Sequence, residues 1–180
     1  MADINFNELN QLLASVNLND VTAESSSGFE ELPDGYYLSE VEKAELTTSK
    51  NTGRPQVAMQ FSVAENGIAP YVDEKGFTKM KNLEHTKGRK IFKYYPLVDE
   101  KSLKTFTSDM LKFEGSEPGV PLLPREAFET GEILEEAITA LIGYRIYVQV
   151  STTVKKGTEE KQSWKNLISW KRAKTFNLPE

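Results

Sequence analysis

Two consecutive segments decide the fold: Gly35-Tyr-Tyr-Leu-Ser-Glu-Val-Glu-Lys-Ala-Glu-Leu46 and, after a polar turn, Pro55-Gln-Val-Ala-Met-Gln-Phe-Ser-Val63. The second segment alternates apolar and polar residues, which is the period of a half-buried strand. Its apolar residues predict a core face, and its Gln, Ala and Ser residues predict a face that meets solvent or a ligand. The two segments together predict an antiparallel strand pair.

The first segment changes phase along its length. Tyr37 and Val41 share one face, whereas Ala44 and Leu46 share the other. A β-bulge near residues 42–43 reconciles the two phases. Because a bulge bends a strand, the pair predicts the beginning of a small closed barrel.

The rest of the domain extends this barrel with three more strands and a helical connection. The predicted elements are a polar connection at 65–87 with a small hairpin at Tyr71-Val72 and Phe77-Thr78, a strand at 88–96, a helix capped by Asp99, a second helix at 131–142, a strand at 144–154, a hairpin loop at 155–161 and a strand at 163–171. The apolar spacing places these helix residues inward: Leu103, Phe106, Met110, Phe113, Ile133, Leu134, Ala137, Ile138 and Leu141.

The N-terminal region is predicted to be an appendage of the barrel domain. Apolar residues recur at helical spacing over residues 4–16, residues 17–28 have the composition of a linker, and we expect residues 17–30 to be mobile. We therefore divide the chain into an arm and linker at 1–30, a barrel domain at 31–174 and a short loose tail at 175–180. The arm either covers an open end of its own barrel or mediates self-association with a second copy.

Composition excludes several classes of site. The chain has 180 residues, no cysteine and a single histidine, so disulfides, thiolate metal sites and His-rich metal sites are excluded. We expect no cofactor, no metal and no enzymatic activity. The absence of a signal-peptide pattern and of a long apolar run predicts a cytoplasmic protein with no membrane contact.

Charge is segregated along the chain although the formal net charge is −5. Residues 75–113 carry ten Lys or Arg against four Asp or Glu, and residues 139–180 carry eight against three. The acidic residues are concentrated in residues 1–49 and 114–138. The two basic blocks therefore contain the third strand and the last hairpin, and we expect acidic side chains to be absent from a groove between them.

Three strands, a helical connection and two strands form the order of an OB-fold, which commonly binds oligonucleotides through its second and third strands and two loops. Those loops are residues 49–54 and 155–161. The third strand interleaves basic and aromatic residues, as sequence-tolerant single-strand binding requires; its two phases leave open which set faces the core. The candidate nucleic-acid-binding residues are Lys50, Arg54, Lys87, Arg89, Lys90, Phe92, Lys93, Tyr94, Arg145, Tyr147, Lys155, Lys156 and Trp164.

Short pieces at 32–37, 42–50, 53–61, 88–92 and 141–148 add a resemblance. The sequence resembles a phage-encoded family, long described only as a domain of unknown function, whose members are considered single-stranded-DNA-binding proteins with an OB-fold. The resemblance implies protection of single-stranded DNA during bacteriophage DNA replication or recombination, in the cytoplasm of the host cell. The chain ends in Asn177-Leu-Pro-Glu180 and not in the long acidic tail of many single-strand-binding proteins.

Two other function classes stay open. The chain is alternatively an interaction module, such as a recombination mediator or a structural barrel of a phage particle. A nuclease would use the cluster Glu129, Glu132, Glu135 and Glu136. Three of these carboxylates fall on the outward side of the predicted second helix, near its N-terminus, where the helix dipole favours negative charge.

Overall fold

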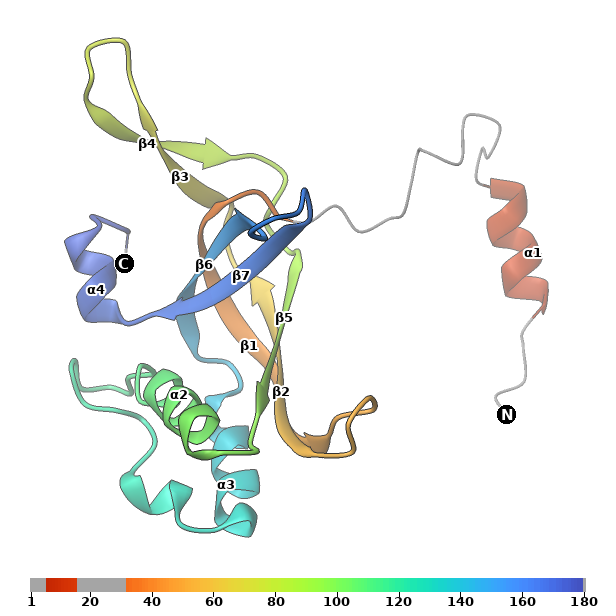
Figure 1. Cartoon of the computed structure of the whole chain (residues 1–180). Helices are drawn as coiled ribbons and strands as arrows, with labels where there is room; N and C mark the ends of the chain where they lie inside the picture. Colours follow the sequence, from red (N-terminus) through yellow and green to blue (C-terminus); the bar gives the residue numbers. More distant parts are fainter. Residues whose placement is uncertain (1–5, 16–31, 180) are drawn as a thin grey trace. The chain divides into compact units, whose positions relative to one another are not determined.

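The computed structural model describes residues 6–15 and 32–179 (Figure 1). They belong to two units, Met1–Glu31 and Leu32–Glu180. Helix α1, Phe6–Ser15, confirms the helix expected in the arm, and it exposes Phe6, Leu9 and Leu13. The expected linker at 17–28 lies outside the described residues. No helix within the described ranges is long and apolar enough to cross a membrane.

The second unit is built on an antiparallel sheet of seven strands with the order β4-β3-β1-β2-β5, in which β6 pairs with β1 and β7 pairs with β6. The strands are β1 Gly35–Thr48, β2 Pro55–Val63, β3 Gly67–Val72, β4 Thr78–Leu83, β5 Lys90–Pro96, β6 Arg145–Val154 and β7 Lys161–Ile168. The five predicted main strands are thus present, and β3 and β4 form the hairpin expected between the second and third of them.

The bulge in β1 is confirmed. The register between β1 and β2 shifts between Val41 and Lys43, so Glu42 is the extra residue. Before the bulge Tyr37 and Val41 are buried, and after it the buried residue is Ala44. The bulge keeps apolar side chains in the core on both sides of the bend, because it changes the phase of the strand.

The closed barrel is not confirmed, because the sheet stays open between β5 and β7. These strands end two of the three paths that leave β1, and no ladder joins them in the described part of the chain. Side chains bridge the opening instead. The Lys165 Nζ donates to the Phe92 carbonyl at 3.2 Å, and the Lys93 Nζ donates to the Lys165 carbonyl. Ammonium groups can satisfy edge carbonyls in this way, and charged side chains at an edge also discourage pairing with another strand.

Helices between β5 and β6 complete the main core. Helix α2, Glu100–Met110, starts at Asp99, whose carboxylate accepts from the Ser102 amide at 2.7 Å as predicted for a cap. Helix α3, Gly131–Ile138, lies between two 3-10 turns, Arg125–Phe128 and Thr139–Leu141. The inward residues are confirmed except at two positions: Leu103 and Ile133 are exposed by 47% and 43%, because each helix buries a narrower face than its apolar spacing suggested.

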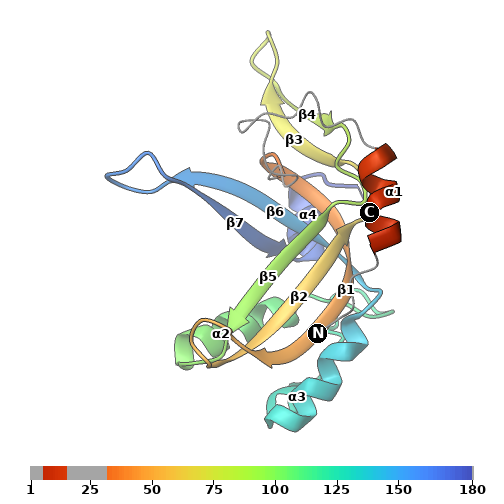
Figure 2. The same cartoon turned by 90° about the vertical axis from the view of Figure 1, so that its right-hand side faces the viewer.

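We predicted that the fifth main strand extends to residue 171 and that a loose tail follows it. The structure corrects both parts of this prediction. Strand β7 ends at Ile168, and α4, Trp170–Thr175, follows it (Figure 2). Ala173 and Leu178 are buried against Tyr147 and Ile168. They form a second, smaller core on the outer side of β1 and β6, to which Tyr36, Leu38 and Ile68 contribute partly buried side chains.

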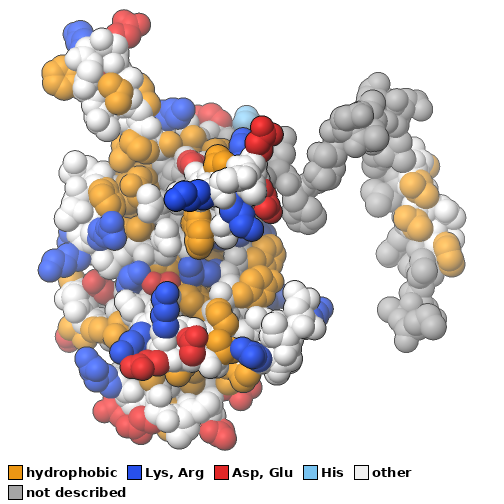
Figure 3. All heavy atoms as spheres, viewed as in Figure 1, with side chains coloured by type: hydrophobic (Ala, Val, Ile, Leu, Met, Phe, Trp, Pro, Cys, Tyr) orange, Lys and Arg blue, Asp and Glu red, His pale blue; other side chains and the backbone are white. Residues whose placement is uncertain are grey.

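The β3–β4 hairpin projects from the rest of the unit (Figure 1) and carries apolar side chains in solvent (Figure 3). Val72 and Phe77 are exposed by 67% and 65%. Its turn is held by Asp73, whose carboxylate accepts from the backbone amides of Phe77 and Lys75, each at 2.9 Å. These bonds, the Phe77 amide first, and the Lys79 ammonium lower the pKa of Asp73.

Candidate functional site

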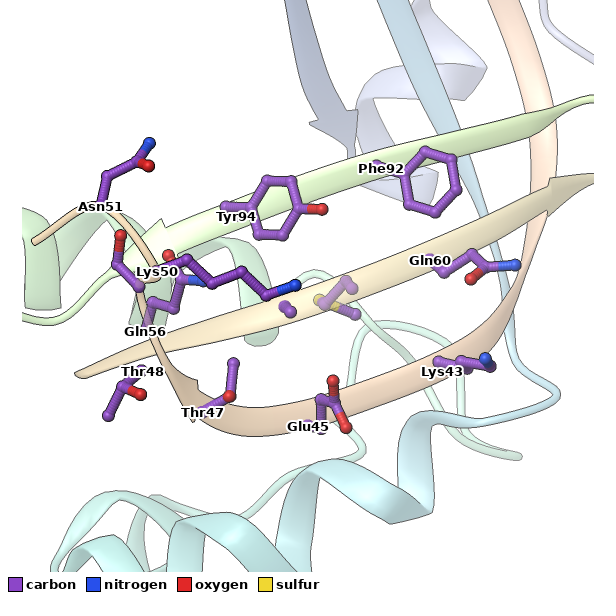
Figure 4. Close-up of a pocket in the computed structure, with 13 residues that line it drawn as sticks. Lys43, Glu45, Thr47, Thr48, Lys50, Asn51, Gln56, Gln60, Phe92 and Tyr94 are labelled. Atoms are coloured by element: carbon purple, nitrogen blue, oxygen red, sulfur yellow. The ribbon is translucent and has the colours of Figure 1, made fainter. Parts of the chain in front are cut away.

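A groove of about 570 Å³ lies on the outer face of β1, β2 and β5 (Figure 4). Three strands and one loop supply its lining: Lys43, Glu45, Thr47 and Thr48 from β1, Gln56, Ala58, Met59 and Gln60 from β2, Phe92 and Tyr94 from β5, and Ser49, Lys50 and Asn51 from the β1–β2 loop. Outward alternation of β2 places its polar residues on this floor, as the sequence predicted.

The strand register arranges these side chains in rows across the sheet. Glu45 pairs with Ala58, which pairs with Tyr94 on the other side. In the next row Gln60 lies between Lys43 and Phe92. One wall of the groove is therefore aromatic, the opposite wall carries Lys43 and Glu45, and the floor between them is polar apart from Ala58 and the buried Met59.

The structure decides the phase of β5. Ile91 and Tyr95 are buried, while Phe92 and Tyr94 are exposed by 43% and 58%. Both rings line the groove on the same edge, one row apart (Figure 4). Exposed aromatic rings on adjacent rows of a strand are available for stacking, because no other element of the second unit covers them.

Lys93 lies in the inward phase of β5, and this corrects its prediction as a nucleic-acid-binding residue. Its Nζ donates to the Lys165 carbonyl in the opening between β5 and β7, and the ammonium lies 5.1 Å from the Tyr95 ring centroid. Burial lowers the pKa of Lys93, and the nearby Lys112 and Lys165 lower it further, against an opposing contribution from Asp109. Because its ammonium donates to the Lys165 carbonyl, Lys93 belongs to the opening between β5 and β7 and does not line the groove.

The β1–β2 loop presents Lys50 to the groove. The loop closes through hydrogen bonds from the Ser49 amide to the Arg54 carbonyl and from the Gly53 amide to the Ser49 carbonyl, both at 2.8 Å. Gly53 has φ +69°, a left-handed conformation that glycine adopts without strain. The Lys50 side chain reaches over β2 (Figure 4), while Arg54 is exposed where the loop rejoins β2.

Acidic side chains are present in the groove, contrary to the expectation from charge segregation. The Glu42 carboxylate accepts from the Gln60 amide at 2.8 Å and from the Lys90 ammonium. The hydrogen bond from Lys90 is the main reason why the pKa of Glu42 is lowered. Glu45 lines the groove directly. The charge blocks along the sequence did not predict this, because sheet pairing places β1, which belongs to the acidic block 1–49, beside β2 and β5.

Tyr147 is not accessible for nucleic-acid binding, contrary to the prediction. Its side chain is only 4% exposed, its hydroxyl donates to the Pro179 carbonyl at 2.6 Å, and its ring packs edge-on against Trp170. It is part of the second core beneath α4, so no base can reach its ring. Its neighbour Arg145 is exposed and pairs with Glu40 at 3.3 Å, outside the groove lining.

The β6–β7 hairpin carries the remaining predicted contacts. Lys155 and Lys156 are exposed at its tip, with Lys155 at 3.8 Å from Glu160. Trp164 is 46% exposed and donates through Nε1 to the Thr153 hydroxyl at 2.8 Å. The hairpin and the β1–β2 loop extend toward the same side of the sheet (left in Figure 2). These residues flank the groove without lining it.

Lys87 and Arg89 lie just before β5. The Lys87 amide donates to the Asn66 side chain at 2.9 Å, and the Val63 amide donates to the Arg89 carbonyl at 2.8 Å. The backbone is therefore anchored to the end of β2, and the Lys87 side chain stays exposed. Of the thirteen predicted residues the groove lining itself includes three: Lys50, Phe92 and Tyr94.

The acidic residues of the helical connection stay apart from this site. Glu129, Glu132, Glu135 and Glu136 are all exposed. Within residues 6–15 and 32–179, no group of three or more His, Cys, Asp or Glu side chains is arranged to hold a metal ion.

A comparison with protein-family models matches residues 18–114 to the family described as "Protein of unknown function (DUF669)". The chain belongs to this family. No curated protein matches the chain. The part matched to DUF669 contains β1 to β5 and α2, and therefore every side chain that lines the groove. Strands β6 and β7 and the covering helix α4 lie beyond it.

Proposed function

We propose that the groove on β1, β2 and β5 binds single-stranded DNA with little sequence preference, as part of phage DNA replication or recombination. The observation that carries this proposal is the pair of uncovered rings, Phe92 and Tyr94, beside a polar floor and the Lys50 ammonium. Stacking of a base on an aromatic ring contributes about 1–3 kcal/mol and tolerates any base, because every base has a π-face.

The spacing of the two rings fits an extended strand. Residues two apart on a strand are separated by about 7 Å, whereas successive bases stacked in B-DNA rise by about 3.4 Å. Each ring can therefore take one base only if the bases are drawn apart from one another. A duplex cannot meet this condition without unpairing, so the geometry favours single strands.

The connectivity of the sheet supports the same proposal. Strands β1, β2 and β5 on one side, and β6 and β7 on the other, follow the strand order of an OB-fold, with the β3–β4 hairpin inserted between the second and third strands. OB-folds are partly open barrels that bind oligonucleotides on the equivalent face and loops. The groove occupies that face, and the β1–β2 and β6–β7 loops flank it.

The double variant Lys50→Ala/Arg54→Ala tests the proposal. If both side chains contact phosphates, the slope of log affinity for oligo-dT against log salt should flatten by about 1.4, at roughly 0.7 for each contact. Loss of affinity should be similar for all sequences, because phosphate contacts carry no sequence information. Fluorescence titration at several salt concentrations measures both quantities.

The matched control is Lys101→Ala/Lys104→Ala, which removes the same charge from exposed positions on α2. Its slope should stay near that of the wild type. Unchanged binding by the folded Lys50→Ala/Arg54→Ala variant at every salt concentration would show that the groove is not the DNA site.

A second candidate function is a protein-interaction module, and the exposed apolar side chains of the β3–β4 hairpin favour it: Tyr71, Val72, Phe77 and Met80. Self-association through the N-terminal arm belongs to this candidate, and the exposed Phe6, Leu9 and Leu13 of α1 support it. Light scattering of Leu9→Asp/Leu13→Asp checks the arm. If this variant has the same mass in solution as the wild type, the arm does not mediate self-association.

A further inference from the structure

The row Glu45, Ala58 and Tyr94 differs from the next row of the groove. In the row of Lys43, Gln60 and Phe92, the middle position carries a long amide side chain, which Glu42 holds in place. In the first row the middle position is only a methyl group. The groove therefore has a gap in its floor between the Tyr94 ring and the Glu45 carboxylate.

Glu45 is also distinct among the outward carboxylates of β1. Glu40 pairs with Arg145, and Glu42 binds Lys90 and Gln60. Within the described residues, the Glu45 carboxylate makes no hydrogen bond or ion pair. A carboxylate that lines a groove without such a contact has its acceptor oxygens available to a ligand.

We propose that this row is a base-reading subsite, an inference that rests on the proposed binding of single-stranded DNA. A base stacks on Tyr94 above Ala58, and the Glu45 carboxylate accepts a hydrogen bond from its exocyclic amine. Cytosine, adenine and guanine each carry such an amine. Thymine and uracil present a carbonyl oxygen at the corresponding edge, which a carboxylate repels.

The dimensions of the sheet permit this contact. Neighbouring strands lie about 4.8 Å apart, so the backbones of β1 and β5 are separated by about 10 Å across Ala58. A base on Tyr94 extends over this gap toward β1. The Lys50 side chain also reaches over β2 (Figure 4), and on an exposed loop it can turn toward a phosphate of the bound strand. The subsite therefore combines one stacking contact, one carboxylate and one nearby cation.

The test compares equal-length oligo-dC, oligo-dT and oligo-dU at about pH 8, where cytosine is neutral. The oligomers have the same ring size, and oligo-dU separates the effect of the thymine methyl group from that of the carbonyl. We expect the wild type to bind oligo-dC about 5-fold more tightly than the other two, a modest preference added to the stacking and phosphate contacts that every sequence can make. In Glu45→Gln the ratio should fall to near 1, because an amide both donates and accepts and so serves cytosine and thymine alike.

Glu42→Gln is the matched control. It removes a neighbouring carboxylate and frees Lys90, so affinity should rise for all three oligomers while the ratio between them stays that of the wild type. Equal binding of the three oligomers by the wild type would overturn the subsite and leave the proposed function standing. An equal fall of the ratio in Glu42→Gln and Glu45→Gln would also overturn it, since the effect would then be general electrostatics. Failure of every oligomer to bind at low salt would overturn both proposals.

Discussion

Two outer faces of the same sheet carry aromatic residues, but only one of them is covered. On β1 and β6, Tyr36 and Tyr147 lie beneath α4 and the residues that follow it, where Leu178 is buried. On β5, Phe92 and Tyr94 line an open groove. All four residues point away from the main core, so alternation alone does not separate them. The difference shows that an outward aromatic residue joins a second core or stays exposed in a groove according to what covers it.

The covering segment depends on a specific end to α4. Asn177 has φ +56°, a left-handed conformation that asparagine tolerates better than most residues. It turns the chain so that the Leu178 amide donates to the Ala173 carbonyl at 3.0 Å. This αL ending directs Leu178 back onto the second core, as in helices that end with an apolar contact beyond the cap.

The largest predicted effect breaks the covered face. Tyr147→Ala removes a nearly fully buried ring and its hydrogen bond to the Pro179 carbonyl. We expect the free energy of unfolding to fall by about 3–5 kcal/mol, because truncation of a buried aromatic residue leaves a cavity. Chemical denaturation measures this loss. A change below about 1 kcal/mol would show that α4 contributes little to the fold, and that both faces are equally accessible.

The strand pair and its bulge were predictable from the sequence because buried residues in a half-buried strand recur at every second position. Val57, Phe61 and Val63 mark one face of β2, and the change of phase between Val41 and Ala44 located the bulge within one residue. The same reasoning identified Phe106 and Met110 as core residues of α2. Burial of apolar area is the dominant favourable term in folding, so the pattern that it selects is strong.

Three features were not predictable in the same way. The phase of β5 was ambiguous because Lys93 shares a face with Ile91 and Tyr95, and its ammonium finds a carbonyl in the sheet opening. The opening itself depends on the separation of β5 and β7, which no local pattern encodes. Helix α4 was missed although Ser169 and Asn177 are suitable ends for a helix, since its six residues are too few for a periodic signal.

The groove was only partly predictable. Aromatic and basic residues of β5 and the loop indicated a nucleic-acid contact, and Phe92, Tyr94 and Lys50 do line one groove. Gln60 was predicted on a face that meets solvent or a ligand, but the contribution of Glu45 was missed, since its position depends on the register of β1 with β2. The outward phase of β2 gave no decisive signal, because polar residues on one side of a strand are the ordinary pattern of a face that meets solvent.

A second prediction concerns the open face and should have a smaller effect. Tyr94→Ala should weaken binding of single-stranded DNA by about 1–3 kcal/mol without changing the salt slope, because a stacked base is lost and no phosphate contact is lost. Its free energy of unfolding should change by no more than about 0.5 kcal/mol, as is usual for exposed positions. Fluorescence titration and chemical denaturation of one preparation test both parts. A loss of stability as large as that of Tyr147→Ala would remove the contrast between the two faces.

The smallest predicted effect uses pH to report on the covered face. Burial, with a further contribution from the Glu65 charge, raises the pKa of Tyr147 above its usual value. Above the unfolded-state pKa of about 10, the unfolded chain loses the phenol proton while the folded chain keeps it, so the free energy of unfolding falls as pH rises toward the folded-state value. Tyr147→Phe should therefore flatten this fall between about pH 9 and 11, apart from a constant loss for the hydrogen bond to Pro179.

Tyr37→Phe is the reference, because burial raises the pKa of Tyr37 to about 12 and its substitution should flatten the curve more. Denaturation at a series of pH values measures the slopes, and a slope in Tyr147→Phe identical to that of the wild type would mean that solvent reaches this phenol and that α4 does not seal the face.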